Sequence, residues 1–250
     1  MPVKSTSWAA ANQRAESTPT LDLRLAVQRV RTRRPRFRDT PRAASKVAVD
    51  LLTTADALAL TQKVAQYVDI IELGTPLIKS EGLRAISAIK AAHPDKEVFA
   101  DLKTADAGFL EADIAFSAGA DIFTVLGSAG DATVKGAVEA GRKHGKKVVA
   151  DLIGVADRVE RARELSKLGV AFVELHAGLD EQAQPGYSIQ TLLDDGKIAG
   201  VAFSIAGGIK IDTIAAVRDA GADVAVAGGA IYSAEDPAAA AKVLKEALAD

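Results

Sequence analysis

The amino-acid sequence predicts a single α/β domain, a (β/α)8 or TIM barrel, preceded by a basic amino-terminal extension. Three observations support this fold class: after residue 45, short apolar runs recur about every 22 to 31 residues, amphipathic alanine-rich segments separate them, and glycines mark the joints. Runs rich in Val, Ile and Ala are typical of parallel strands that helices cover on both faces. Eight such units fill the remaining 205 residues, which favours a closed barrel.

The eight predicted strands follow one another at regular intervals. They lie at 46–50, 68–73, 98–103, 121–126, 147–152, 170–176, 201–206 and 223–227, with helical patterns between them such as 55–67 and 155–168. Gly119, Gly145, Gly169 and Gly221 each precede a strand, where the residue that ends a helix takes a positive φ. No G-x-G-x-x-G fingerprint follows the first strand, which disfavours an open dinucleotide-binding sheet.

The composition excludes several classes of protein. With 48% hydrophobic residues the chain is too apolar to be disordered as a whole, yet no apolar run approaches the ~18 to 20 residues that cross a bilayer. The chain has no cysteine, which excludes disulfides, thiolate zinc sites and cysteine nucleophiles, and is compatible with a reducing compartment. We therefore expect a cytoplasmic protein without a membrane partner.

The amino-terminal segment differs in charge from the rest of the chain. Residues 1–45 carry ten basic and three acidic side chains, a net charge of +7, whereas residues 46–250 carry a net charge of −9. Eight arginines lie between Arg24 and Arg42, and Pro35 and Pro41 interrupt any helix there. We predict a disordered Arg-rich extension at 1–45 and a catalytic barrel at 46–250.

This extension has three alternative interpretations. Arg-rich, acid-poor segments suit organelle import, and they also bind phosphate backbones. We favour an appended extension without function, because aromatic interleaving and a basic helix face are both missing, and we expect no nucleic-acid partner.

Charged side chains recur at or near the carboxyl ends of the predicted strands. The acidic ones are Asp50, Glu72, Asp101, Asp151 and Glu174. In a barrel these ends form the face that carries active sites. Asp101 and Lys103 are two residues apart and point the same way, as do Glu174 and His176. Each acid alone could be an isolated cap, but as a set they predict a hard cation held by oxygens, most plausibly Mg²⁺.

His176 and two glycine pairs complete the predicted site. His176 is the one histidine that lies at the carboxyl end of a predicted strand, which makes it the candidate for proton transfer. The pairs Gly207–Gly208 and Gly228–Gly229 end strands seven and eight. Barrels commonly bind phosphate in the loops after these two strands, so we expect a phosphorylated substrate.

The residues at the third strand carry a resemblance to a known family. Asp101, Lys103 and Asp106 match the D-x-K-x-x-D motif of the orotidine 5′-monophosphate decarboxylase superfamily. The segments VAVDLL, DIIELGTPLI, FADLKTADAG, VELHAGLDEQ, AGGI and AGGAIY resemble, in this order, those of the 3-hexulose-6-phosphate synthase family. The resemblance covers residues 46–250 and does not include the first 45 residues.

The resemblance implies an aldehyde-lyase of the ribulose monophosphate pathway. Such an enzyme uses Mg²⁺, or alternatively Mn²⁺, to join formaldehyde to D-ribulose 5-phosphate and form D-arabino-hex-3-ulose 6-phosphate through an enediolate. It implies that Glu72 and Asp101 contact metal and substrate, that Lys103 stabilises the oxyanion, and that Asp50 binds substrate hydroxyls. The remaining implied roles are proton transfer for His176 with Asp180, phosphate binding for Gly207, Gly208, Gly228 and Gly229, and a contribution of Asp106 to the neighbouring subunit's site in a homodimer.

Two other functions remain open. The sister enzyme 3-keto-L-gulonate-6-phosphate decarboxylase shares the fold, motif and enediolate, but it typically carries arginines where this chain has Leu179 and Gly229. Both departures favour the synthase. A sugar-phosphate-binding barrel without catalysis is the alternative of another class, and the intact set of Asp101, Lys103, Asp106 and His176 argues against it.

Overall fold

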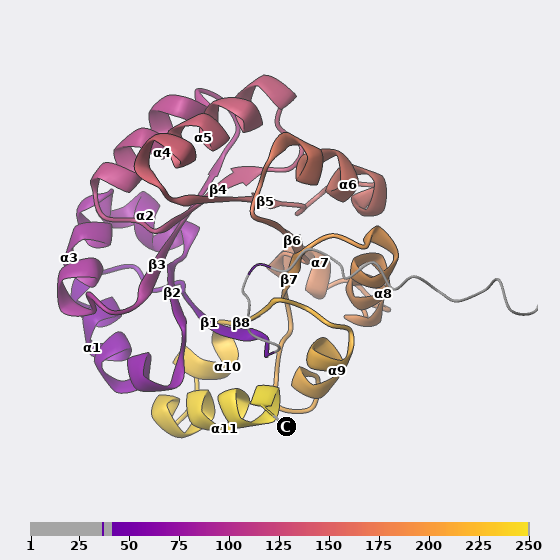
Figure 1. Ribbon diagram of the computed structural model, residues 1–250. Helices are drawn as coiled ribbons and strands as arrows, with labels where there is room; N and C mark the ends of the chain where they lie inside the picture. Colours follow the sequence, from indigo (N-terminus) through magenta and orange to yellow (C-terminus); the bar gives the residue numbers. More distant parts are fainter. Residues whose placement is uncertain (1–36, 38–41, 250) are drawn as a thin grey trace, which may run out of the picture. The chain divides into compact units, whose positions relative to one another are not determined.

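The structure, a computed structural model, describes residues 37 and 42–249 (Figure 1). The prediction of a disordered extension therefore lies almost entirely outside the described residues. Within them, eight parallel strands close into a barrel in sequence order, with β1 paired to β8, which confirms the predicted fold class. The strands are β1 (Ala44–Val49), β2 (Ile70–Leu73), β3 (Glu97–Thr104), β4 (Ile122–Leu126), β5 (Lys147–Asp151), β6 (Phe172–His176), β7 (Phe203–Ala206) and β8 (Val224–Ala227).

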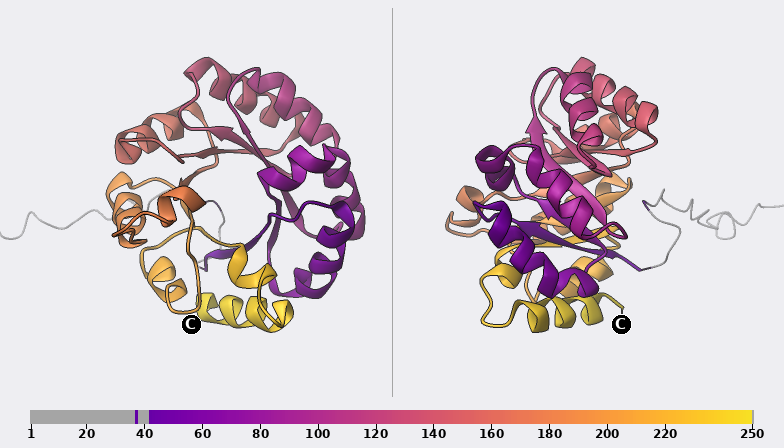
Figure 2. Two further views of the ribbon diagram at one scale, coloured as in Figure 1. Left: turned by 180° about the vertical axis from the view of Figure 1, so that it is seen from behind. Right: turned by 90° about the vertical axis from the view of Figure 1, so that its left-hand side faces the viewer.

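Helices surround the barrel, as both views of Figure 2 show. They are α1 (Thr54–Val64), which a 3₁₀ turn at Ala65–Tyr67 extends, α2 (Thr75–Glu81), α3 (Arg84–Ala92), α4 (Gly108–Ser117), α5 (Asp131–His144), α6 (Arg158–Leu168), α7 (Leu179–Gln182), α8 (Gln190–Ala199), α9 (Ile214–Asp219), α10 (Gly229–Tyr232) and α11 (Pro237–Ala249). Helix α11 packs against both α1 and α9 and so completes the ring. In the described part of the chain, no helix combines the length and the apolar character that crossing a bilayer requires.

The joints between helices and strands match the sequence prediction. Gly119, Gly145, Gly169 and Gly221 take φ values of 111°, 64°, 100° and 80°, a region in which a side chain would be strained. Gly145 and Gly169 are the residues that end α5 and α6, and both adopt the left-handed conformation.

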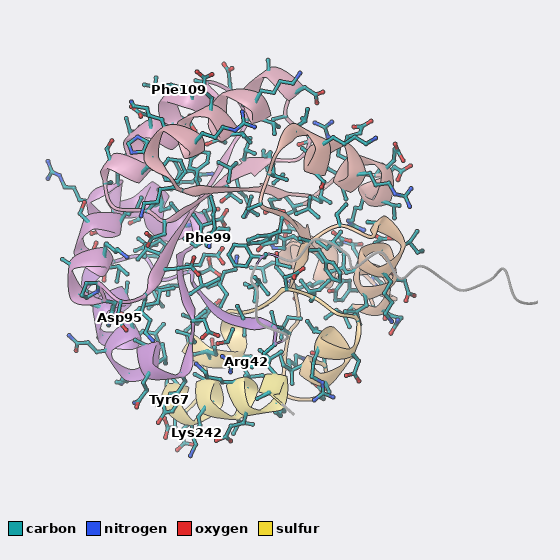
Figure 3. The ribbon with its side chains drawn as sticks, viewed as in Figure 1. Arg42, Tyr67, Asp95, Phe99, Phe109 and Lys242 are labelled. Atoms are coloured by element: carbon teal, nitrogen blue, oxygen red, sulfur yellow. The ribbon has the colours of Figure 1, made fainter. Side chains whose placement is uncertain are left out.

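Two apolar layers stabilise the barrel. The outer and larger one lies between strands and helices, and includes Val47, Ile71 and Val173. The inner one fills the amino-terminal part of the bore and includes Phe99 and Phe172; Figure 3 shows Phe99 inside the barrel. Because side chains alternate along a strand, the inward positions that follow this apolar layer carry the charged side chains. The bore is thus apolar at its amino-terminal end and polar at its carboxyl-terminal end.

The barrel begins slightly before the predicted boundary. Strand β1 starts at Ala44, two residues earlier than expected, and Phe37 already packs against the amino-terminal end of the bore. Its ring lies edge-on to Phe172, with a centroid distance of 4.6 Å, and the Lys147 Nζ lies 4.2 Å from its centre. The Phe37 amide donates a hydrogen bond to Asp223. These contacts follow from the apolar character of this end of the bore, because Phe37 shields its apolar side chains from water. The predicted boundary between extension and barrel at residue 45 stays a prediction.

Candidate active site

A cavity of about 1390 Å³ opens at the carboxyl ends of the strands. Most of the predicted site residues line it, and they come from six strands and their following loops: Asp50, Glu72, Asp101, Lys103, His176, Asp180, Gly207, Gly208, Gly228 and Gly229. Asp106 does not line this cavity. The alternation of side chains along β3 and β6 also holds, because Asp101 and Lys103, and likewise Glu174 and His176, face the same space.

An irregularity in β3 presents the D-x-K pair to the cavity. The pairing register with β4 shifts between Ala100 and Thr104, and Lys103 takes a φ of 49°, which is uncommon for a residue with a side chain. Its Nζ lies 2.6 Å from Asp101 Oδ2. Thr75 and Thr124 donate hydrogen bonds of 2.8 and 3.0 Å to the two oxygens of Asp101. These three contacts therefore fix the orientation of the Asp101 carboxylate in the cavity.

Asp151, at the end of β5, joins Lys103 to His176. It is fully buried, and its Oδ2 lies 2.9 Å both from Lys103 Nζ and from His176 Nδ1. Burial opposes ionisation, but the hydrogen bond and charge of His176, together with Lys103, outweigh it and hold the pKa of Asp151 well below its usual range. The sequence prediction counted Asp151 among the strand-end acids but gave it no role. The tripeptide Ala-Asp-Leu occurs at both Asp101 and Asp151, and this repetition is the signal that could indicate a site role for Asp151.

These contacts determine the state of Lys103 and His176. Burial disfavours the charge of Lys103, yet Asp101 and Asp151 overcome this effect and raise its pKa. Burial likewise lowers the pKa of His176, and the hydrogen bond and charge of Asp151 reverse that shift and raise it. Because a carboxylate only accepts hydrogen bonds, Nδ1 of His176 carries a proton and Nε2 remains as the basic atom. The imidazole is thus oriented for proton transfer.

A second group of charges lies in the bore next to Asp101. Lys46 of β1 is completely buried, and its Nζ lies 2.7 Å from Glu72 Oε2 and 2.6 Å from Glu174 Oε2. Glu174 also accepts a hydrogen bond of 3.0 Å from Ser204. Sequence reasoning treated Lys46 only as the first residue of a strand. Its inward position could have been found by counting back in steps of two from Asp50.

Glu72 is the second carboxylate that Lys46 contacts. Its buried Oε2 faces the Lys46 ammonium, and Glu72 also lines the cavity beside Asp101. Burial raises the pKa of Glu72; Lys46 opposes the shift, whereas Glu174 and Asp101 add to it. Two carboxylates that line one cavity, Glu72 and Asp101, provide the oxygen donors that a divalent cation prefers.

A different group of donors could also hold a metal ion. One ligand atom each from Asp151, Glu174 and His176 lies within 4.8 Å of the others. Lys103 and His176 already bind Asp151, however, and Lys46 and Ser204 bind Glu174. The carboxylates of the cavity are therefore consistent with a divalent metal.

Asp50 lies at the exposed rim of the cavity, close to the backbone of the next strand end. Partial burial of the carboxylate, which removes water from it, and the negative charge of Asp101 raise the pKa of Asp50. A Cβ placed on Gly74 would lie 1.9 Å from Asp50 Oδ1. Gly74 therefore makes room for the Asp50 carboxylate, and Asp180 lines the cavity from the short helix α7.

The two glycine pairs form the wall next to β7 and β8. Gly207 and Gly208 take φ values of 112° and 72°, and a Cβ on Gly207 would lie 2.5 Å from the carbonyl oxygen of Ala177. Only glycine fits such a position. Gly228 and Gly229 open the first turn of α10. Both pairs expose backbone to the cavity, as the phosphate prediction requires.

Asp106 lies in the exposed loop between β3 and α4, outside this cavity. Its Oδ1 accepts a hydrogen bond of 2.7 Å from the amide of Ala107, which takes a φ of 51°. Helix α4 follows with three apolar side chains turned to solvent, Phe109, Leu110 and Ile114. Within one chain, Asp106, the last residue of the D-x-K-x-x-D motif, thus does not line the cavity.

Comparisons with known proteins agree with this geometry. A model of the orotidine 5′-phosphate decarboxylase / HUMPS family matches residues 46–244. The 3-hexulose-6-phosphate synthase of Mycobacterium gastri is 65% identical over 204 residues, which are 82% of this chain and 99% of that protein.

Solved structures extend the comparison to the fold. A crystal structure of a 3-hexulose-6-phosphate synthase has a TM-score of 0.81 at 65% identity and covers 82% of this chain and 99% of its own. That of 3-keto-L-gulonate-6-phosphate decarboxylase from Vibrio cholerae has a TM-score of 0.74 at 29% identity, with coverages of 83% and 98%. Sequence and fold agree over the whole barrel, and the chain is an enzyme that belongs to the orotidine 5′-phosphate decarboxylase / HUMPS family.

Proposed function

We propose that the chain is a Mg²⁺-dependent aldolase that joins formaldehyde to C1 of D-ribulose 5-phosphate, forming D-arabino-hex-3-ulose 6-phosphate. The linked chain of contacts from Asp101 through Lys103 and Asp151 to His176 carries this proposal, because it holds a cation and a base side by side in the cavity. The 65% identity to a 3-hexulose-6-phosphate synthase supports the choice of reaction.

The reaction begins at the carbon next to the ketone of the sugar phosphate. His176 Nε2 takes a proton from C1, and the electron pair of the broken C–H bond moves towards the C2 oxygen to give an enediolate. Lys103, held charged by two carboxylates, stabilises the developing oxyanion. C1 then attacks formaldehyde, the C–O π bond of formaldehyde breaks, and the new alkoxide takes the proton back from His176. Atoms and charges balance over the cycle.

Glu72 and Asp101 are the residues that would hold the metal. A divalent cation bound there would act as a Lewis acid on the oxygens of the enediolate. Glu72 and Asp101 both line the cavity, and the threonines fix the orientation of Asp101. Mg²⁺ suits these oxygen donors, and Mn²⁺ is the alternative.

The remaining residues bind and orient the substrate. Gly207, Gly208, Gly228 and Gly229 present backbone N–H groups to the phosphate, so that most of the binding energy comes from the part of the sugar that does not react. Asp50, beside Asp101, binds hydroxyls of the sugar chain. Asp180, on the α7 rim, assists the proton transfer of His176.

The active unit in this proposal is a homodimer. Helix α4 exposes Phe109, Leu110 and Ile114, which a second copy of the chain would cover. Asp106, on the neighbouring loop, would then reach the cavity of the partner subunit. Mixing Asp106→Ala with Lys103→Ala tests this arrangement, because hybrid dimers contain one site with both native residues. Random mixing should restore about a quarter of the wild-type activity, and no recovery after subunit exchange would contradict the composite site.

An activity assay decides between the two related reactions. We expect formaldehyde to disappear only when ribulose 5-phosphate and a divalent metal are both present. His176→Ala should also abolish exchange of the C1 proton in ribulose 5-phosphate without formaldehyde. Turnover that survives thorough chelation would refute the metal assignment, and wild-type exchange in the His176 variant would refute the base.

The second candidate is 3-keto-L-gulonate-6-phosphate decarboxylation. The structural similarity to such an enzyme favours it as the alternative, whereas Leu179 and Gly229, at positions where that enzyme typically carries arginine, disfavour it. Parallel assays with both substrates separate the two reactions. Specific turnover of the gulonate would overturn our proposal, and binding of either sugar phosphate without turnover would favour a non-catalytic barrel.

We also propose a cytoplasmic location. The absence of cysteine fits a reducing compartment, and the exclusion of thiols suits an enzyme whose substrate is a reactive aldehyde. Cell fractionation with an antibody against the barrel would test this location; recovery in an organelle would favour the import interpretation of residues 1–45.

A further inference from the structure

The proposed reaction assigns no role to the buried charge of Lys46. Its side chain lies inside the barrel with 0% exposure, and its Nζ stands between Glu72 and Glu174 at 2.7 and 2.6 Å. The same Nζ lies 3.6 Å from the centre of the Phe99 ring, in the apolar layer of the bore. A lysine charge removed this far from water is costly, so it persists only because both carboxylates compensate it.

The position of Lys46 relative to the proposed metal site is specific. Lys46 contacts the buried Oε2 of Glu72, and Glu72 lines the cavity together with Asp101, whose charge raises the pKa of Glu72. Any cation bound between Glu72 and Asp101 would share Glu72 with the Lys46 ammonium. Two cations on one carboxylate repel each other, and the water-poor bore screens that repulsion poorly.

The charge balance of the cavity gives Lys46 a function. Five carboxylates meet in and beside the cavity, namely Asp50, Glu72, Asp101, Asp151 and Glu174, while the lysines in contact with them are Lys46 and Lys103. Without a metal, Lys46 is the cation that faces Glu72 and Glu174. It therefore supplies the counter-charge that keeps these two acids from repelling each other.

We propose that Lys46 is an internal counter-ion of the metal site, which stands in for the divalent cation at Glu72 in the metal-free protein and thereby weakens metal binding. Lys46 is a positioning residue: it acts on Glu72 and does not contact the reacting atoms. This inference rests on the proposed metal site at Glu72 and Asp101. It adds that the charge of Lys46 lowers the affinity of that site for the metal.

The test compares two variants that differ only at Lys46. In the wild-type background, loss of Lys46 would leave Glu72 and Glu174 able to share a proton, which would mask the change. We therefore use Glu174→Gln and the double variant Lys46→Met/Glu174→Gln, because methionine nearly preserves the volume of the lysine stem. Mn²⁺ binding is measured by electron paramagnetic resonance of the free ion, without substrate and without reference to turnover.

The double variant should bind Mn²⁺ at least about 10-fold more tightly than Glu174→Gln, since the competing cation is gone. Equal or weaker binding by the double variant would overturn the proposal. Lys147→Met is the matched control: this lysine lies at the opposite end of the barrel, on Phe37 and Glu97, and its loss should leave Mn²⁺ affinity unchanged. A similar gain in affinity in this control would also count against a specific effect of Lys46.

Two further outcomes separate this inference from the proposed function. If the wild type does not bind Mn²⁺, the proposed metal site fails, and the role of Lys46 fails with it. If Glu174→Gln alone abolishes binding, the metal belongs to the cluster of Asp151, Glu174 and His176, which also overturns the proposal.

A stability measurement keeps the proposal testable if the double variant folds poorly. In the Glu174→Gln background, where no second carboxylate can share a proton with Glu72, Lys46→Gln should lower the melting temperature markedly in EDTA. Saturating Mn²⁺ should recover most of the loss, because the metal then supplies the missing charge. An equal drop with and without metal would mean that Lys46 serves packing alone.

Discussion

At the scale of single residues, Asp151 contacts both the proposed cation and the proposed base. It binds Lys103 and His176 through the same oxygen, and its other oxygen accepts a hydrogen bond of 2.8 Å from the Ile153 amide. Asp151 therefore orients the cation and the base and also sets the proton affinity of each. Substitution at this position should alter the pH dependence as well as the rate.

We predict that Asp151→Asn moves the acidic limb of the kcat/KM profile to lower pH. The base is neutral imidazole, and Asp151 raises the pKa of His176, so activity in the wild type falls as pH drops through this raised value. Without the carboxylate the pKa falls, and the neutral base persists to lower pH. The maximal rate should decrease by roughly 10²-fold, since the base also loses its orientation.

The measurement is a pH series of kcat/KM for ribulose 5-phosphate at saturating formaldehyde. An acidic limb that stays in place, or that moves to higher pH, would contradict the role of Asp151 as the partner of His176. Asp113→Asn is a suitable control, because Asp113 binds His144 on the outer helices and should leave the profile unchanged.

A second residue-scale prediction concerns Gly74. Its φ of −63° suits any residue, so the effect of a substitution depends on space alone. The Cβ of Gly74→Ala would meet the Asp50 carboxylate at 1.9 Å and displace it from the rim of the cavity. We expect about a 10-fold loss of kcat/KM with little loss of stability, because a displaced rim carboxylate misaligns substrate hydroxyls.

Gly130→Ala is the matched control for this prediction. Gly130 has a φ of −62°, a Cβ there meets nothing within 4 Å, and the residue lies outside the cavity. Steady-state kinetics of both variants, with circular dichroism as a check on folding, provide the measurement. Full activity of Gly74→Ala would show that Asp50 has no fixed position in the reaction.

At the scale of elements, helix α4 differs from the other helices of the ring. It packs closely against α5, yet Phe109, Leu110 and Ile114 are exposed by 38%, 61% and 42%. Figure 3 places Phe109 at the outer ring, far from Phe99 in the bore. The helix also follows directly on the loop that carries Asp106, so an interface on α4 would bring that loop to a neighbouring subunit.

We predict that Leu110→Glu dissociates the dimer. A buried, unpaired carboxylate at the centre of an apolar interface is costly, and the dissociation constant should rise by about 100-fold or more. Sedimentation velocity measures the change, and activity should fall in parallel because Asp106 is lost from each site.

Ile198→Glu is the control variant. Ile198 is as exposed as Leu110, at 61%, but it lies on α8 and not on the apolar face of α4. This variant should remain dimeric and active. A Leu110→Glu protein that sediments as the wild type would exclude α4 as the interface.

At the scale of the whole molecule, the two ends of the bore have separate tasks. The carboxyl-terminal end collects the charges of the site, whereas Phe172 and its apolar neighbours fill the amino-terminal end. Phe37 covers this apolar end from a position that precedes β1. Stability and catalysis are thus divided between opposite faces, as is usual for such barrels.

We predict that Phe37→Ala lowers the free energy of unfolding by about 1 to 3 kcal/mol, because the ring contacts with Phe172 and Lys147 are lost. The kinetic constants should not change, since the cavity lies at the other end of the barrel. Urea denaturation followed by circular dichroism gives the first quantity and steady-state assays the second. Unchanged stability would mean that Phe37 is dispensable to the barrel.

Most of the strands could be predicted because their signal is local. The runs of Val, Ile and Ala are found where the strands lie, and the glycines before β4, β5, β6 and β8 take the expected positive φ. Site residues at strand ends, such as Asp101 and His176, followed from the same local pattern combined with the general rule that barrels carry their sites at this face.

The amino-acid sequence alone thus determined the eightfold barrel, the face that holds the site and the chemical types of its side chains. The tertiary structure alone decided which charged side chains are in contact. Lys103 of β3 contacts Asp151 of β5, past the intervening strand β4, and Lys46 lies between Glu72 and Glu174. The physical reason is that contacts between strands depend on register around a closed ring. Side chains 48 or 128 residues apart reach the same level of the bore only when all eight strands have paired.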